Sequence, residues 1–251
     1  MKIVAYSDTK TSKKLINGME VSALILDSRI TSQWGQVITT AENLGLFVTD
    51  LKSVVLKGDG SISLIALFRG DSCQRHIQSI DVNGVQTITN ENEVSSLRED
   101  FFSSNTGTTA TLDSCSLLFV KPSLVKQQSV GAVIQKLLDT GYELSAILSV
   151  ALDRATATEF LAKYEGVYTE SLDLHILEFS GGVGIAIEVR SENAVPNLRK
   201  TCGPWDVDMA RELFPESLRG KYGVDNVRDG VYCCDLEGSG GEECRYFFEV
   251  L

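Results

Sequence analysis

The chain has 251 residues, of which 34 are acidic and 23 basic, so its formal net charge is -11, and 43% of its residues are hydrophobic. This length allows one large domain or two small ones with a packed core. The acidic balance and the lack of any Lys/Arg run argue against nucleic acid or an anionic membrane surface as a partner. The apolar runs are strand-sized, too short to span a bilayer. Met1 to Ser7 lack the features of a signal peptide, so we expect a cytosolic route.

The first half of the chain is predicted to form a reduced α+β unit. Its apolar periodicity indicates strands at Val21–Leu26, Phe47–Leu56, Ser61–Phe68 and Gly84–Thr89, with helices at Trp34–Leu44 and Asp71–Ile80. Only the turn sequence Lys57–Gly60 separates its second and third strands.

The second half repeats this order in a fuller form. Strands are predicted at Cys115–Val120, Leu144–Leu152, Gly182–Val189 and Val231–Cys233, and helices at Val130–Leu138, Thr156–Glu165, Ser171–Phe179 and Asn193–Cys202. The repeat predicts an α+β protein with two tandem ferredoxin-like (βαββαβ) domains on antiparallel sheets. We place the domains at 1–104 and 113–251. A Ser/Thr/Gly-rich linker at 105–112 is expected to be flexible.

The cysteines and histidines do not form a metal-binding pattern. There is no CxxC pair among the six cysteines, and only His76 and His175 are available beside them. We therefore predict free, buried thiols, packing roles for both histidines, and no metal site.

Five segments carry a family resemblance: LLFVKPSLV (117–125), VGAVIQKLLDTGYEL (130–144), FSGGVGIAIE (179–188), LRKTCGP (198–204) and SLRGKYG (217–223). They resemble the nucleoside diphosphate kinase family over nearly all of residues 113–251. The tail from Val231 and the extra residues before Leu218 look most like a ciliary member with two such domains. The first half is similar in VSALILDSRI, GQVITTAENLGLFVTDL and EVSSLREDFF. That member carries a small β domain ahead of the pair. Only Met1 to Ser7 match its end, so we expect it to be absent.

The resemblance also assigns roles at the expected active site. Lys121, Arg199 and Arg219 stand where active members hold the nucleotide phosphates, and they are interpreted as a vestigial nucleotide site. Tyr232 replaces the phosphoacceptor histidine, and Glu243 matches the acid that orients it. Around them Asp235 is retained, Asp229 replaces an asparagine, Cys234 replaces a serine, and Trp205 lies close to an expected threonine.

The loss of the histidine predicts a pseudoenzyme with no catalytic residue and no cofactor. A phosphoryl relay needs a nucleophile that is unprotonated near neutral pH and a labile phospho-intermediate. Tyrosine, with a pKa of about 10, meets neither requirement. Asp229 also brings negative charge to a polyanion pocket. In the first domain the strand that would end in Lys-Pro ends in Leu26-Asp27, and no histidine lies near Thr87 to Asn92.

The leading hypothesis is a structural component of the ciliary or flagellar axoneme, a microtubule inner protein bound to tubulin and to other such proteins in the doublet. The expected location is therefore the cytoplasm and its cytoskeleton. No nucleic acid, membrane or closed homo-oligomer is expected, and the two halves should pack as a fixed pseudo-dimer. The alternatives are a nucleotide-binding regulator of microtubule nucleation, and residual kinase activity.

Overall fold

The computed structural model describes residues 19–56, 60–102, 107–166 and 171–251. Met1 to Ser7 lie outside these ranges, as do three residues of the predicted turn at Lys57–Gly60. The first half contains strands β1 (Glu20–Leu26), β2 (Phe47–Val55), β3 (Ile62–Gly70) and β4 (Val85–Ile88) and helices α1 (Trp34–Asn43), α2 (Cys73–Gln78) and α3 (Glu91–Phe102), with a 3-10 segment at Ser28–Gln33.

The second half adds four strands and eight helices to the part of the chain that the structure describes. The strands are β5 (Cys115–Val120), β6 (Glu143–Val150), β7 (Gly184–Arg190) and β8 (Val231–Cys233). The helices are α4 (Pro122–Lys126), α5 (Val130–Asp139), α6 (Arg154–Leu161), α7 (Leu172–Phe179), α8 (Ala194–Cys202), α9 (Val207–Leu213), α10 (Leu218–Tyr222) and α11 (Gly240–Arg245). A 3-10 turn at Ala162–Tyr164 follows α6, and a π-helical turn at Tyr246–Val250 follows α11.

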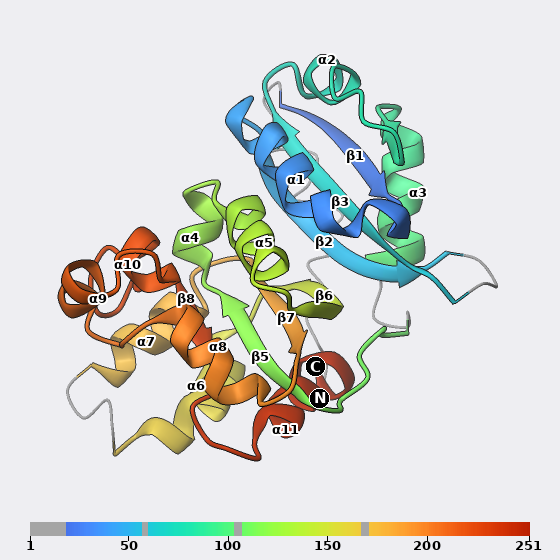
Figure 1. Cartoon of the computed structure of the whole chain (residues 1–251). Helices are drawn as coiled ribbons and strands as arrows, with labels where there is room; N and C mark the ends of the chain where they lie inside the picture. The colour runs from blue at the N-terminus through green and yellow to red at the C-terminus, as the bar shows by residue number, and fades with distance from the viewer. Residues whose placement is uncertain (1–18, 57–59, 103–106, 167–170) are drawn as a thin grey trace.

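The strands of both halves form one antiparallel sheet in the order β4-β1-β3-β2-β6-β7-β5-β8 (Figure 1). The join lies between β2 and β6, where Lys52 pairs with Leu148. Two serine side chains add hydrogen bonds between these strands. The Ser149 hydroxyl accepts from Leu51 N at 3.1 Å, and the Ser53 hydroxyl accepts from Ile147 N at 2.8 Å. The two halves are therefore continuous at the level of the sheet.

Helices α1 and α5 cross directly above this join (Figure 1). The crossing needs glycine on both helices. A Cβ atom at Gly35 would lie 2.3 Å from the Gln135 backbone nitrogen, and one at Gly131 would lie 2.3 Å from that of Thr39. Backbone atoms cannot move aside as a flexible side chain can, so these two glycines set the distance between the helices.

Glu42 of α1 caps the N-terminus of α5. Its two carboxylate oxygens accept from Val130 N and Gly131 N, each at 2.9 Å. These are backbone donors that the first turn of a helix leaves without a partner. Glu42 is 4% exposed. The cap is thus a buried polar contact between the two halves.

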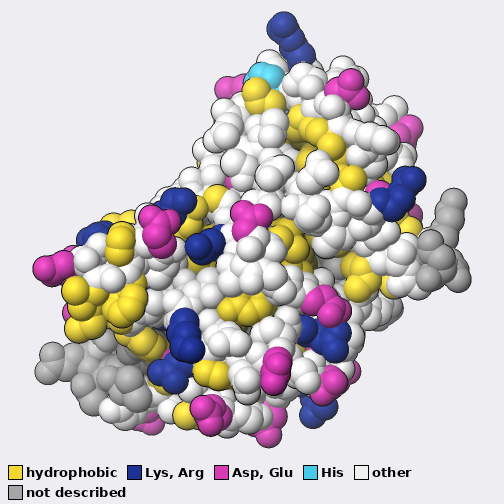
Figure 2. Space-filling model, viewed as in Figure 1, with side chains coloured by type: hydrophobic (Ala, Val, Ile, Leu, Met, Phe, Trp, Pro, Cys, Tyr) yellow, Lys and Arg dark blue, Asp and Glu magenta, His cyan; other side chains and the backbone are white. Residues whose placement is uncertain are grey.

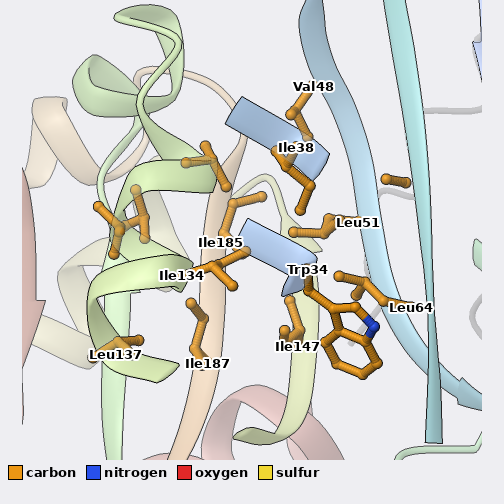
Figure 3. Packing of buried hydrophobic residues seen from close by; sticks show 14 of the residues in the cluster. Trp34, Ile38, Val48, Leu51, Leu64, Ile134, Leu137, Ile147, Ile185 and Ile187 are labelled. Carbon is orange, nitrogen blue, oxygen red and sulfur yellow. The ribbon is translucent and has the colours of Figure 1, made fainter. Parts of the chain in front are cut away.

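Three buried clusters cover the sheet. The largest lies on the α1 and α5 face and draws side chains from both halves, as Figure 3 shows with Trp34, Ile38 and Leu51 opposite Ile134 and Ile187. On the other face, α6, α7 and α11 cover the second half, and α3 covers the first half. The shared cluster supports the predicted fixed packing of the halves, because neither half encloses it alone.

The structure confirms the α+β fold and the strand order within each half. Between β6 and β7 lies the expected helix pair, α6 and α7, whereas β2 and β3 follow each other as an antiparallel pair. Helices α3, α4, α9, α10 and α11 were not predicted from the sequence. Among the described residues, no helix is both long enough and apolar enough to cross a membrane.

The described part of the predicted linker forms hydrogen bonds with the second half. Thr111 N and Leu112 N donate to Glu188 at 2.8 and 2.7 Å, and the Thr109 hydroxyl donates to Ser145 O at 2.6 Å. These hydrogen bonds fix residues 109–112 against β6 and β7. Composition alone did not indicate them, because their acceptors belong to distant strands.

Candidate functional site

Tyr232 occupies the centre of β8, where it pairs with Phe119 of β5. Its side chain is 2% exposed. The hydroxyl donates to Glu243, with 2.9 Å to each carboxylate oxygen, and lies 2.8 Å from the hydroxyl oxygen of Tyr164. The expected proximity of Glu243 to the family's histidine position is therefore present, with a phenol in place of an imidazole.

Aromatic rings enclose the Tyr232 side chain. Phe160, Tyr164 and Phe179 each meet its ring edge-on, with centroid distances of 5.3 to 5.9 Å. Lys163 lies 4.5 Å from the centroid of Phe160 and forms an ion pair of 2.5 Å with Glu243. Together these groups separate the Tyr232 hydroxyl from solvent.

The electrostatics of this enclosure keep its potential nucleophiles protonated. Burial, reinforced by the negative charge of Glu243, raises the pKa of Tyr232 well above its usual value of 10. The same two causes raise the pKa of the Cys234 thiol to about 12. Neither group is an anion at neutral pH. The arrangement thus offers a hydrogen-bonded core and no activated nucleophile at this position.

Lys121 and Arg219 meet at a single carboxylate. Lys121 follows β5 and precedes α4, and its ammonium lies 2.5 Å from Asp229 Oδ1. Arg219 of α10 lies 2.9 Å from Asp229 Oδ2 through its Nε. The side chains of both cations are 2% exposed and that of Asp229 is 4% exposed. Sequence reasoning identified the three positions but not this shared ion pair.

Backbone carbonyls accept further hydrogen bonds from these cations. Lys121 Nζ donates to Val227 O at 3.2 Å, and Arg219 donates to Gly203 O at 2.7 Å and to Val231 O at 3.2 Å. The Trp205 ring lies 5.5 Å from the Arg219 guanidinium. A phosphate would have to replace several of these interactions in order to bind.

Arg199 has a different partner. Its Nε lies 3.2 Å from Asp235 Oδ1, and its side chain is 51% exposed. Burial raises the pKa of Asp235 above its usual value. The structure therefore joins Lys121 and Arg219 through Asp229 but pairs Arg199 with a separate acid.

The two histidines lie apart from any activated nucleophile. His175 of α7 is 3% exposed, and burial, followed by the charge of Lys121, lowers its pKa to about 4. It is therefore neutral at physiological pH. His76 lies half-buried on α2. Both positions agree with the packing roles expected from the sequence.

The described residues also bound two hollows. One, of about 380 Å³, is bounded by α1, α5 and residues 216–222, and another, of about 400 Å³, by α7 and residues 225–228. Neither is lined by Lys121, Arg199 or Tyr232.

Comparison with known proteins identifies the family. The family model described as nucleoside diphosphate kinase matches residues 114–250. Nucleoside diphosphate kinase homolog 7 of Mus musculus is 31% identical over 241 residues, which make up 94% of this chain and 56% of that protein. The chain belongs to the nucleoside diphosphate kinase family.

A second relative and a solved structure are also similar to this chain. The homolog 7 of Rattus norvegicus is 36% identical over 157 residues, covering 61% of this chain and 40% of that protein. The chain spans about half the length of these curated relatives. A crystal structure of the nucleoside diphosphate kinase of Aquifex aeolicus matches with a TM-score of 0.51 at 22% identity, covering 54% of this chain and 94% of that one. This likeness supports the fold alone.

Sequence reasoning missed two features of this region. Phe160 and Tyr164 reach Tyr232, and Lys163 reaches Glu243, from a segment distant in sequence, so no spacing indicated them. The second feature is a cluster formed by Cys115, Glu188 and Cys244, which come from β5, β7 and α11. Spacing rules for metal ligands do not detect such a cluster, because its members are not close along the chain.

Proposed function

We propose that this chain is a non-catalytic member of its family, a structural component of the ciliary or flagellar axoneme that binds tubulin and other inner proteins of the doublet microtubule. The observation that carries the non-catalytic part is the buried hydrogen bond from Tyr232 to Glu243 at the position of the family's histidine. A phenol held in this way is protonated and shielded from a nucleotide.

The charge balance around Asp229 supports the same reading. Because this carboxylate already forms ion pairs with Lys121 and Arg219, a nucleotide would have to displace an internal anion before its phosphates met these cations. This weakens the alternative of a nucleotide-binding regulator of microtubule nucleation, which relies on Lys121, Arg199 and Arg219. The same argument counts even more strongly against the alternative of residual kinase activity, which requires nucleotide binding and a nucleophile.

The structural role is supported by the single packed body that the two halves form and by its exposed apolar surface. The sheet and the largest core cluster join both halves into one body, which presents a defined surface to partners. Figure 2 shows apolar side chains gathered over the α9 region, where Met209, Leu213 and Phe214 are each about half exposed or more. An exposed apolar surface of this kind is suited to protein contacts. The net negative charge of the chain does not favour binding to acidic tubulin, so we expect such local apolar surfaces to make the contacts. The axonemal location rests on the resemblance to a two-domain ciliary member.

Two experiments test the proposal. A tagged full chain is expected to stay with axonemes washed in salt and detergent, at a regular spacing along the doublet. Complete release into the detergent-soluble fraction, with unchanged axonemal density after gene deletion, would contradict the structural role. Binding of a labelled nucleoside diphosphate to the purified chain separates the scaffold from the regulator, because only the regulator predicts saturable binding.

A further inference from the structure

Three buried side chains with metal-binding atoms converge between the sheet and α11. Cys115 begins β5, Glu188 lies on β7, and Cys244 lies on α11. The two Sγ atoms and a carboxylate oxygen all lie within 4.8 Å of one another. One ion can contact all three after small adjustments, because zinc lies about 2.3 Å from a thiolate sulfur and about 2.0–2.2 Å from a carboxylate oxygen.

Glu188 is a buried carboxyl group whose hydrogen-bond donors in the described part of the chain are all neutral. The residue is 0% exposed. Its carboxylate accepts from Thr111 N, Leu112 N and the Ser145 hydroxyl, at 2.8, 2.7 and 2.5 Å. All three donors are neutral, and in the described part of the chain no Lys, Arg or His forms an ion pair with Glu188. Buried charges in proteins are normally paired or bound to a metal.

The hydrogen bonds of Glu188 leave room for a ligand. A carboxylate has about four lone-pair directions, and three are used here. One of the two oxygens, Oε1, accepts only the Leu112 N–H. The three donors fix the orientation of the carboxylate, as the outer contacts of a metal ligand do.

The two thiols favour a thiophilic cation over a hard one. The contact with Cys115, burial and the charge of Glu188 all raise the pKa of Cys244, so Cys244 is a thiol when no ion is present. A divalent cation reverses this balance. It stabilises two thiolates beside the carboxylate, and two protons are released to solvent as the two metal–sulfur bonds form.

We propose that Cys115, Glu188 and Cys244 bind one Zn²⁺ ion, which fastens α11 to the sheet. Two sulfur ligands select zinc over magnesium or calcium. Three protein ligands leave one tetrahedral position for a water molecule. The role is structural, since the site joins β5, β7 and α11 and, through Glu188, the segment at residues 111–112.

Metal titration of the reduced full chain tests this site. After removal of metals with a chelator, Co²⁺ is expected to give one thiolate-to-cobalt charge-transfer band at one ion per chain, and Zn²⁺ should abolish it. Zn²⁺ should also raise the unfolding temperature. Cys115→Ala, Cys244→Ala and Glu188→Gln should remove binding, whereas Ser145→Ala should weaken it about 10- to 100-fold. Cys73→Ala, at another fully buried thiol, is the matched control and should bind as the wild type does.

Alkylation of the wild-type chain provides a second test, which does not depend on whether the variants fold. In the wild-type chain, Zn²⁺ should slow the alkylation of Cys115 and Cys244 by a thiol reagent more than that of Cys73. The proposal fails if the reduced chain gives no thiolate–cobalt band, or if the band persists in both cysteine variants. It also fails if Zn²⁺ protects neither thiol, or if the pair forms a disulfide in air at the same rate with and without Zn²⁺.

Discussion

At the scale of single residues, Asp229 sets the charge balance of the buried site. It is the shared partner of Lys121 and Arg219, and all three side chains are almost fully enclosed. Two cations and one carboxylate leave a net positive charge that backbone carbonyls must offset. An internal carboxylate therefore takes the place that a bound anion would otherwise fill.

Replacing Asp229 with asparagine should destabilise the chain and create a response to phosphate. Two buried cations would lose their counter-charge, which costs about 3–5 kcal/mol in comparable buried pairs. Inorganic phosphate or a nucleoside diphosphate should then raise the unfolding temperature of Asp229→Asn but not that of the wild type. Thermal unfolding across a phosphate series measures both effects.

Asp225→Asn provides the matched control for this experiment. Its ion pair with Arg228 lies at the surface, with side-chain exposures of 44% and 55%, so the expected loss is below about 1 kcal/mol. If Asp229→Asn is as stable as this control, or if phosphate stabilises both variants equally, Asp229 does not hold the two cations.

Restoring histidine at Tyr232 should not restore phosphoryl transfer. In Tyr232→His the rings of Phe160 and Phe179 still enclose the position, and Asp229 still pairs with Lys121 and Arg219. Groups that act as a unit do not recover activity one at a time. The purified variant is expected to show neither turnover nor an acid-labile phosphoenzyme, and Tyr232→Phe is the comparison. Turnover in the histidine variant alone would mean that the site is open.

At the scale of elements, the contact of α1 with α5 links the halves through one carboxylate. Burial raises the pKa of Glu42 from 4.5 to about 7, against the opposing effect of the Gly131 and Val130 N–H donors. A raised pKa in the folded state means that folding favours the protonated acid. The contribution of Glu42 to stability is therefore present below pH 4.5 and is lost as the pH rises to about 7.

Glu42→Gln should remove this pH dependence. Between about pH 4.5 and 7 the unfolding free energy of the wild type should fall relative to that of the variant, by up to about 3 kcal/mol at roughly 1.4 kcal/mol per pKa unit. Above pH 7 the difference should be constant. Denaturant unfolding of both chains across this range gives the measurement. Parallel curves at all pH values would show that the carboxyl of Glu42 titrates alike in the folded and unfolded states.

The elements differ in how far the sequence predicted them. Strands such as β5, buried at all six positions, follow from a continuous apolar run, and α5 follows from its helical periodicity. Helices α9, α10 and α11 have seven residues or fewer. They contain too few turns for the helical spacing of apolar residues to be recognised in the sequence. Asp206 and Ser217 cap the first two of these helices, and each was available as a start signal.

The candidate site was predictable in its positions but not in its contacts. Alignment to the family placed Lys121, Arg219 and Tyr232, because strand ends and short motifs are local patterns. The shared ion pair at Asp229 and the Tyr164 contact depend on how α6, α10 and β8 pack together. Packing of this kind joins residues that no local pattern relates.

At the scale of the whole molecule, residues 1–104 should not fold alone. The fragment would expose the β2 edge of the sheet and the half of the largest core cluster that now packs on α5 and β6. A unit of this size buries a small hydrophobic core and is therefore marginally stable, and an open strand edge favours aggregation. Circular dichroism and thermal unfolding of the fragment should show no cooperative transition. A soluble fragment that unfolds cooperatively would contradict this dependence.

The join at β2 and β6 also determines how the molecule responds to dilution. In a pair of separate subunits this contact would weaken as the protein concentration fell, because association is second order. Here both strands belong to one chain, so their meeting is an intramolecular event with a fixed effective concentration. The paired form therefore persists however few copies a cell contains, and it always holds one first half to one second half.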